Sequence, residues 1–282
     1  MCAIPARTFR RFEEGEDMNL FRKEIKFGLK SFLLWTLGLF MFVFAGIVKS
    51  SAAMADGQFM TELINKFPRI VVAVMGMANA DISKFAGFYA VLMQYILVLT
   101  AVFAAHLGSR AVSRESVDKT YEFLFTKPRS RSFILARKLL ASLVFLTAFA
   151  CLNLVFSLLA VKQLGLEGDY TALYVRFSFA LWFVGLVFFS LAAMFAAIFR
   201  VAEQGARAGN LAVMITYAAA VVYDLLEKPG VLRLFTPFRF FLNTEMIDGT
   251  VSVFFLLFCV ALSAVSLFVT FRRFERRDLG AV

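Results

Sequence analysis

The sequence predicts an all-α integral membrane protein with six transmembrane helices. Hydrophobic residues make up 61% of the 282 residues, and 36 residues are Phe. Charged residues make up only 18%, whereas they make up roughly a quarter of a soluble domain. The chain also contains apolar segments of the length that a bilayer requires, which is roughly 20 helical residues for a hydrocarbon core of about 30 Å. A water-soluble core could not bury this much apolar surface.

Six segments meet this requirement and contain no internal Asp, Glu, Lys or Arg, although Asp224 lies at the end of the fifth. They are residues 31–48, 86–107, 139–161, 177–199, 208–225 and 251–271. No internal repeat and no low-complexity segment interrupts this series. Residues 31–271 are therefore expected to form a single six-helix transmembrane domain.

Positive charges indicate the orientation of these spans. The formal net charge is +10, and Lys and Arg concentrate before residue 31, between the second and third spans, and in residues 272–282. An even number of spans places all three stretches on one side, which the positive-inside rule makes the cytoplasm. We expect a multi-pass protein of the plasma membrane with both termini cytoplasmic, and no nucleic-acid interface. Residues 1–30 would form a tail with an amphipathic helix, and residues 272–282 a basic tail.

Residues 19–32 have the pattern of an interfacial helix, here called the elbow segment. Apolar residues fall on one helical face and lysines on another: Phe21, Ile25 and Leu29 on the first, and Lys23, Lys26 and Lys30 on the second. This pattern is typical of a helix that lies flat at the headgroup level, with the lysines facing anionic membrane lipid. The alternative is a cytoplasmic extension of the first span.

Two connections on the opposite side predict short helices. Residues 49–85 include apolar residues at helical spacing before Pro68, which favours a helix on the outer interface. Residues 227–250 are apolar but are interrupted by Pro229, Pro237 and Gly249. Because this stretch is too short and too broken to span the membrane twice, we expect re-entrant or surface helices there.

The cytoplasmic connection between the second and third spans predicts an amphipathic helix. Val117, Tyr121 and Leu124 recur at i, i+4 and i+7, and Phe125 adjoins them. The result is an apolar and aromatic ridge with charged flanks, which requires a groove on a partner. Pro128 would end this helix because it lacks an amide hydrogen.

A membrane-entering helix would start after Pro128, capped by Ser130 or Ser132. The alternative for the whole connection is a solvated charged loop that only anchors the orientation.

The pattern of this connection resembles that of the permease subunits of type-2 ATP-binding-cassette (ABC) exporters. The matching positions are Glu115, Thr120, Glu122, Leu124, Pro128, Ser130, Arg131 and Lys138. Four positions depart from it: Lys119, Tyr121, Arg129 and Arg137, where Gly, Leu, Val and Gly are usual. The elbow segment with the first span is also similar to the family, as are Leu234, Pro237, Phe238 and Gly249 before the last span.

This resemblance implies a permease that exports a hydrophobic or amphipathic substrate, such as a drug, antibiotic, lipid or peptide. The connection would be the ATPase-coupling helix, formed by Glu115, Val117, Thr120, Tyr121, Glu122, Leu124, Phe125, Pro128 and Arg131. ATP and Mg would be bound by separate ABC ATPase subunits, since this sequence has no Gly-rich phosphate loop. We expect no catalytic, cofactor or metal residues in this chain. A second permease chain, identical or homologous, would complete the transporter.

Uncharged polar residues inside the spans have two interpretations. They either bond across helices or line the translocation path: Gln94, Asn153, Asn210, Thr216 and Tyr217. Three other function classes stay open. An ion-coupled secondary transporter is disfavoured because the spans lack carboxylates. A membrane-embedded enzyme is disfavoured because His106 is the single histidine and no nucleophile elbow is present. A non-transporting transmitter or scaffold could use the same fold.

Overall fold

The computed structural model describes residues 6–55, 66–77, 81–117, 130–165, 168–226 and 230–276, and within these ranges the chain is helical and contains no strand. Its long helices are α1 (Ala6–Ala55), α4 (Phe85–Val117), α6 (Arg131–Leu164), α7 (Thr171–Ile198), α8 (Ala202–Leu225) and α11 (Val253–Glu275). Its short elements are α3 (Arg69–Val74), α9 (Gly230–Arg233), the 3-10 helix η1 (Pro237–Arg239) and α10 (Asn243–Asp248).

The six predicted spans are confirmed in the described part of the chain. Helices of sufficient length and hydropathy cover Leu20–Ser50, Phe85–Arg114, Arg131–Gln163, Thr171–Ile198, Ala202–Leu225 and Val253–Glu275. Most of them run past the predicted ends into charged residues, because Lys and Arg are good helix formers and do not interrupt the backbone hydrogen bonds.

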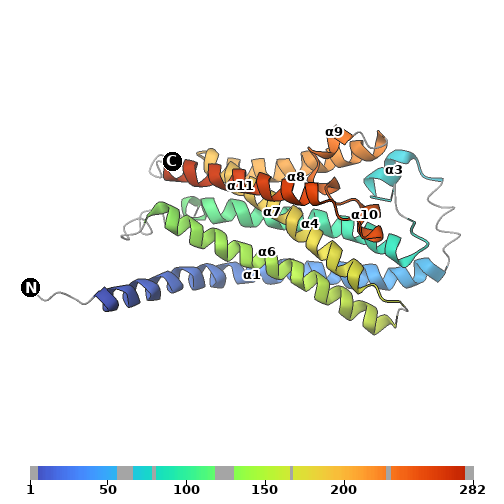
Figure 1. The fold of residues 1–282 in the computed structure, drawn as a ribbon, viewed down its shortest axis with the longest axis horizontal. Coiled ribbons are helices and arrows are strands. Elements are labelled where there is room, and N and C mark those ends of the chain that lie inside the picture. Colours follow the sequence, from blue (N-terminus) through green and yellow to red (C-terminus); the bar gives the residue numbers. More distant parts are fainter. Residues whose placement is uncertain are drawn as a thin grey trace, which may run out of the picture.

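The elbow segment belongs to the N-terminal half of α1 and is not a separate helix. A single helix runs from Ala6 to Ala55, as Figure 1 shows, so residues 19–32 continue directly into the first span. Residues 19–32 contain no Pro, and their one Gly, Gly28, lies where a Cβ would collide with the ring of Phe145 in α6. The structure therefore has the second of the two arrangements that the sequence allowed.

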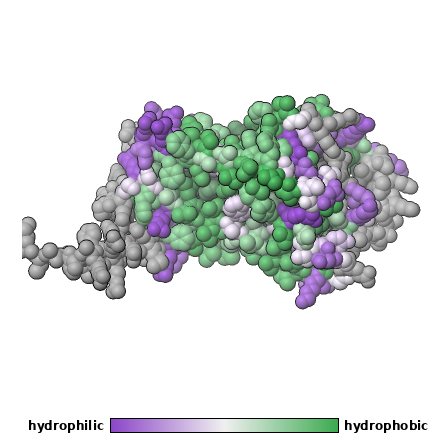
Figure 2. Space-filling view, viewed as in Figure 1, coloured by the Kyte–Doolittle hydropathy of each residue, from purple (hydrophilic) through white to green (hydrophobic). Residues whose placement is uncertain are grey.

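Helices α4 and α7 form the centre of the bundle (Figure 1). In their most apolar stretches 72% and 67% of the residues are buried, against 17% in α1. The outer helices present large apolar side chains to the outside, including Leu37, Val144, Met214, Leu257 and Phe268. In Figure 2 these surfaces form a hydrophobic belt between two hydrophilic ends. This is the surface that a helical protein presents to lipid.

Small residues allow the central helices to approach closely. A Cβ at Gly108 in α4 would collide with the backbone carbonyl of Phe189 in α7. Gly205 and Gly209 in α8 lie in the same way against Ala196 and Ala192 of α7. The backbones can come this close only because these positions lack large side chains, as at other membrane helix interfaces.

The long helices alternate in direction, so the bundle has two distinct ends. One end is here called the terminal end, because α1 begins there and α11 finishes there. At this end α1 lies beside the end of α4, and α11 ends beside the start of α6. The far end carries the short helices (Figure 1). Short re-entrant or surface helices were predicted for residues 227–250, and the structure has the short helices α9, η1 and α10 there. The helix predicted before Pro68 falls mainly on residues 56–65, which lie outside the described residues.

Candidate coupling site and polar contacts of the bundle

The structure describes only the two ends of the connection that carries the predicted coupling helix, and these ends are here called its stems. Helix α4 ends at Val117, which is 61% exposed, and α6 begins at Arg131. The residues of the predicted ridge and its end lie outside the described residues: Thr120, Tyr121, Glu122, Leu124, Phe125 and Pro128. The side chain of Glu115 also lies outside the described part. The contacts that can be followed are therefore those of the stems.

The first stem is held by α1. The guanidinium of Arg114, in the last turn of α4, donates a hydrogen bond of 3.0 Å to the carboxylate of Glu24, and the two side chains are 15% and 16% exposed. Arg114 also lies over the ring of Phe27, with 4.1 Å between the guanidinium carbon and the ring centroid. A partly buried ion pair is screened less than a surface pair, and the aromatic ring adds a cation–π attraction. The elbow segment is thus fastened to the start of the connection.

The second stem is held by α11. Ser130 caps α6, because its hydroxyl oxygen accepts a hydrogen bond of 3.3 Å from the amide of Phe133, and this confirms one of the two predicted caps. The hydroxyl of Ser132 donates to the carboxylate of Glu275, the last residue of α11. Arg131 donates to the backbone carbonyl of Glu275 at 3.5 Å. The first and last long helices therefore hold the two stems of the same connection.

The other predicted residues of the elbow segment differ in their exposure. Lys23, Lys26 and Lys30 are exposed, as a basic face toward lipid or water requires. Of the predicted apolar face, Ile25 packs against the buried core, whereas Leu29 is exposed. Phe21 is half-buried.

A polar cluster lies inside the bundle between α4, α6 and α7. Asn153 donates a hydrogen bond of 2.9 Å to Ser178, and Ser157 donates to the backbone carbonyl of Asn153 at 2.8 Å. The hydroxyls of Ser157 and Tyr89 are 2.9 Å apart. Sequence reasoning selected Asn153, but it passed over Tyr89 and Ser178, which are polar groups in apolar segments and could have been chosen by the same rule.

A buried ion pair at the far end was not predicted. Arg239 in η1 pairs with Asp224 at the end of α8, and their side chains are only 6% and 3% exposed. Arg239 also donates a hydrogen bond of 2.9 Å to the side-chain oxygen of Gln94 in α4. The sequence signal was an Asp at a span end and an Arg in an apolar loop, because ionisable groups in such surroundings require partners. Their positions in the chain do not indicate that they meet.

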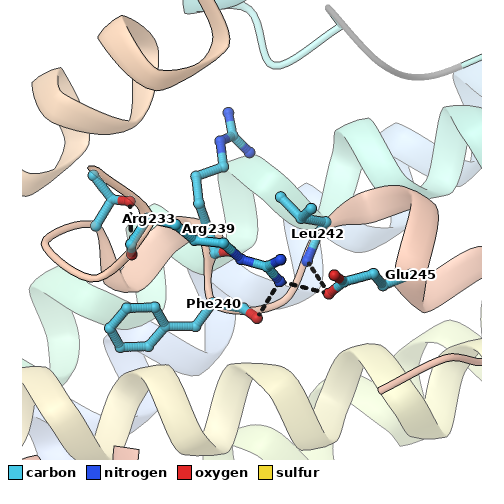
Figure 3. Close-up of polar contacts among 6 residues, drawn as sticks. Arg233, Arg239, Phe240, Leu242 and Glu245 are labelled. Carbon is cyan, nitrogen blue, oxygen red and sulfur yellow. Dashed lines mark hydrogen bonds and ion pairs between the residues drawn. The ribbon is translucent and has the colours of Figure 1, made fainter. Parts of the chain in front are cut away.

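Arg233 binds the loop that carries Arg239, as Figure 3 shows. Its guanidinium donates to the backbone carbonyls of Arg239 at 2.9 Å and Phe240 at 3.0 Å, and to the carboxylate of Glu245 at 2.7 Å. The amide of Leu242 donates to the same carboxylate at 3.4 Å. These bonds tie α9, η1 and α10 into one compact unit at the far end.

The remaining predicted polar residues have different surroundings. Tyr217 donates a hydrogen bond of 2.8 Å to the backbone carbonyl of Val74, which joins α8 to α3. Thr216 donates to the carbonyl of Ala212 in its own helix. Asn210 is exposed on α8. Gln94, Asn153 and Tyr217 thus connect different elements, whereas Thr216 and Asn210 make no side-chain hydrogen bond to another element within the described part of the chain.

Two exposed carboxylates, those of Asp81 and Asp169, precede α4 and α7 at the far end. The hydroxyl of Ser83 lowers the pKa of Asp81, and Lys84 at 3.3 Å lowers it further. The amide of Thr171 donates to Asp169 at 3.0 Å and lowers the pKa of that carboxyl group. Both groups are therefore ionised at neutral pH. Among the described residues, no three His, Cys, Asp or Glu side chains lie close enough together to hold a metal ion.

Comparison with known protein families gives a match over most of the chain. A sequence profile of the ABC-2 family transporter proteins matches residues 18–279, which include all six spans, both stems of the connection and the far-end loop. No curated protein matches the chain. Proteins of this family are membrane components of transporters, are not catalytic themselves and associate with ABC ATPase subunits. The chain, with its six apolar helices and the extent of this match, belongs to the ABC-2 transporter family as a transmembrane permease.

Proposed function

We propose that this permease exports a hydrophobic or amphipathic substrate across the plasma membrane, with energy from ATP that a separate pair of ABC ATPase subunits binds with Mg and hydrolyses. The second permease of the complex would be an identical or homologous chain. The observation that carries the proposal is that both stems of the connection are fastened, Arg114 to α1 and Ser132 to α11. A connection held in this way can pass a displacement to the bundle.

The mechanism follows from these attachments. When ATP closes the ATPase pair, the groove that holds residues 115–131 moves, and the connection moves with it. Arg114 transfers this displacement to α1 through Glu24, and Ser132 transfers it to α11 through Glu275. ATP drives transport only if it favours one arrangement of the spans over another, since a ligand shifts an equilibrium by its differential affinity.

The proposed orientation rests on charge. Exposed Lys and Arg side chains gather at the terminal end on α1 and on α4, including Lys23, Lys26, Lys30 and Arg110. The positive-inside rule places such an end in the cytoplasm. The ATPase would therefore meet the connection on the cytoplasmic side, and the far end with Arg239 and Asp224 would face outward.

The class of substrate is inferred from the polar groups inside the bundle. The groups of the polar cluster around Asn153 are uncharged, and Asn153 already donates to Ser178 and accepts a bond from Ser157 at its backbone carbonyl. The charged pair at the far end is internally neutral, since Arg239 lies against Asp224. Such an interior suits an apolar molecule with a few polar groups better than a small ion.

The coupling assignment can be tested with the complete transporter. Substituting Tyr121→Ala and Glu122→Ala is expected to reduce both co-purification with the ATPase and stimulation of its ATP hydrolysis. Arg207→Ala is the matched control, because Arg207 lies in an exposed pair with Glu203 on α8. If the Tyr121 and Glu122 variants behave as the control does, the connection is not the coupling element.

The same preparation separates export from its alternatives. Substrate efflux from proteoliposomes is expected to follow ATP and not an imposed proton gradient. Efflux driven by the proton gradient alone would instead indicate an ion-coupled carrier. ATP hydrolysis that responds to a partner protein, without efflux of any compound, would indicate a transmitter.

A further inference from the structure

A cleft opens between α1, α4 and α6 at the terminal end of the bundle. Its volume is about 30 Å³. Its lining has a polar part, here called the rim, and an apolar part, here called the floor: Glu24, Arg110, Arg114 and Ser142 make up the rim, and Leu107 and Phe145 belong to the floor. Gly28 also lines the cleft, and there α1 and α6 approach so closely that a Cβ would collide with Phe145.

The rim carries an excess of positive charge. Glu24 pairs with Arg114, so the charges of these two side chains offset each other. Arg110, one turn earlier on α4, is exposed and makes no ion pair with the residues that the structure describes. The rim therefore has two arginines and one glutamate, a net charge of one positive unit. The hydroxyl of Ser142 on the opposite wall likewise has no hydrogen bond within the described residues and is available as a donor.

The cleft lies at the edge of the hydrophobic belt. Next to it, α6 exposes Leu140 and Val144, and α1 exposes Leu33 and Leu37 farther along the belt. At the level of the cleft, α1 also exposes the lysines of the elbow segment. A molecule that fills the cleft from the membrane thus meets a cation and a hydroxyl at its head and apolar side chains along its body.

We propose that this cleft binds the phosphate of an anionic phospholipid, with Arg110 and Ser142 as donors and the acyl chains on the exposed faces of α1 and α6. The volume corresponds to about two water-sized groups, which matches the two unesterified oxygens of a phosphodiester. Arginine favours such oxygens because its guanidinium presents two parallel donors. The apolar floor and flanks favour a lipid over free phosphate, which needs no such surface.

Lipid retention by the full chain tests this site. The protein is purified in detergent and exposed to mixed micelles of phosphatidylglycerol and phosphatidylcholine, and the bound lipid is counted by native mass spectrometry. The wild-type chain is expected to retain phosphatidylglycerol preferentially. Arg110→Gln is expected to lower this retention about tenfold, since it removes a charge-assisted hydrogen bond. Arg110→Glu is expected to lower it at least as far.

A second variant separates the cleft from general surface charge. Ser142→Leu keeps every charge and fills the cleft, so it is expected to reduce retention as Arg110→Gln does. Arg207→Gln is the control, because it removes an exposed arginine near the start of α8 and is expected to leave retention unchanged. Equal losses in the Arg110 and Arg207 variants, or full retention by a folded Ser142→Leu protein, would overturn the proposal.

Competition with inorganic phosphate distinguishes a phospholipid headgroup from free phosphate as the bound anion. Inorganic phosphate in large excess is expected to leave the bound phosphatidylglycerol in place. Displacement of the lipid by phosphate, with the same dependence on Arg110, would show a site for the free anion and contradict the lipid assignment. None of these measurements uses transport, so their result is independent of the proposed export activity.

Discussion

The carboxylate of Glu24 lies 3.0 Å from the guanidinium of Arg114, although 90 residues separate them in the chain. Glu24 belongs to the elbow segment, and Arg114 lies in the last turn before the predicted coupling helix. The pair joins two of the three parts of this permease that were expected to lie at the cytoplasmic surface. It therefore offers the most direct way to disturb coupling without touching the ATPase contact itself.

Neutralising Glu24 is expected to weaken coupling. Glu24→Gln leaves the partly buried Arg114 with a weaker acceptor, and we expect a loss of about 1.5–3 kcal/mol in the free energy of unfolding. Stimulation of the partner ATPase should also fall. Thermal unfolding and ATP hydrolysis measure the two effects. Glu203→Gln, in the exposed pair with Arg207, should change stability by less than about 0.5 kcal/mol.

At the second stem, a substitution is expected to reduce coupling with little effect on stability. Ser132 and Glu275 are bonded at an exposed site, so Ser132→Ala should change the unfolding temperature little. If α11 receives motion through this contact, ATPase stimulation and efflux should nevertheless fall. The assays are those of the reconstituted complex. Normal stimulation in Ser132→Ala would show that α11 is not coupled through this bond.

Breaking the far-end ion pair is expected to destabilise the protein strongly. Asp224→Asn leaves Arg239 buried without its counter-charge, which costs about 3–5 kcal/mol when one partner of a buried pair is removed. The double variant Asp224→Leu with Arg239→Met removes both charges and should recover much of this loss. Denaturant unfolding of the purified chain measures both. A double variant no more stable than the single one would contradict this account.

The close contact between α4 and α7 predicts a position-specific effect of added volume. Gly108→Ala places a methyl group against the carbonyl of Phe189 and should lower the unfolding temperature clearly, because backbone cannot move aside as a side chain can. Gly38→Ala on α1 is the control, since nothing lies within 4 Å of a Cβ there. That substitution should be neutral or slightly stabilising. Equal effects at the two positions would refute the contact.

The spans were predictable because a bilayer imposes a length and an apolar composition on each segment separately. The capping of α6 by Ser130 was also predictable, because a cap depends only on residues that are close together in the sequence. The geometry of the elbow segment was not, because an amphipathic pattern fits both a flat helix and an extension of the span. The pairing of Arg239 with Asp224 and Gln94 depends on how η1 packs against α4 and α8, which no local pattern contains.

The backbone contact at Gly108 also limits how the bundle can change shape. Helices α4 and α7 cannot slide past each other there without forcing a carbonyl group into a neighbouring Cα, so they are expected to keep their register in every state. Rearrangement then falls to α1, α6 and α11, which would rotate around the central helices as around a fixed axis. Restraining that rotation would arrest the permease even while its core stayed intact.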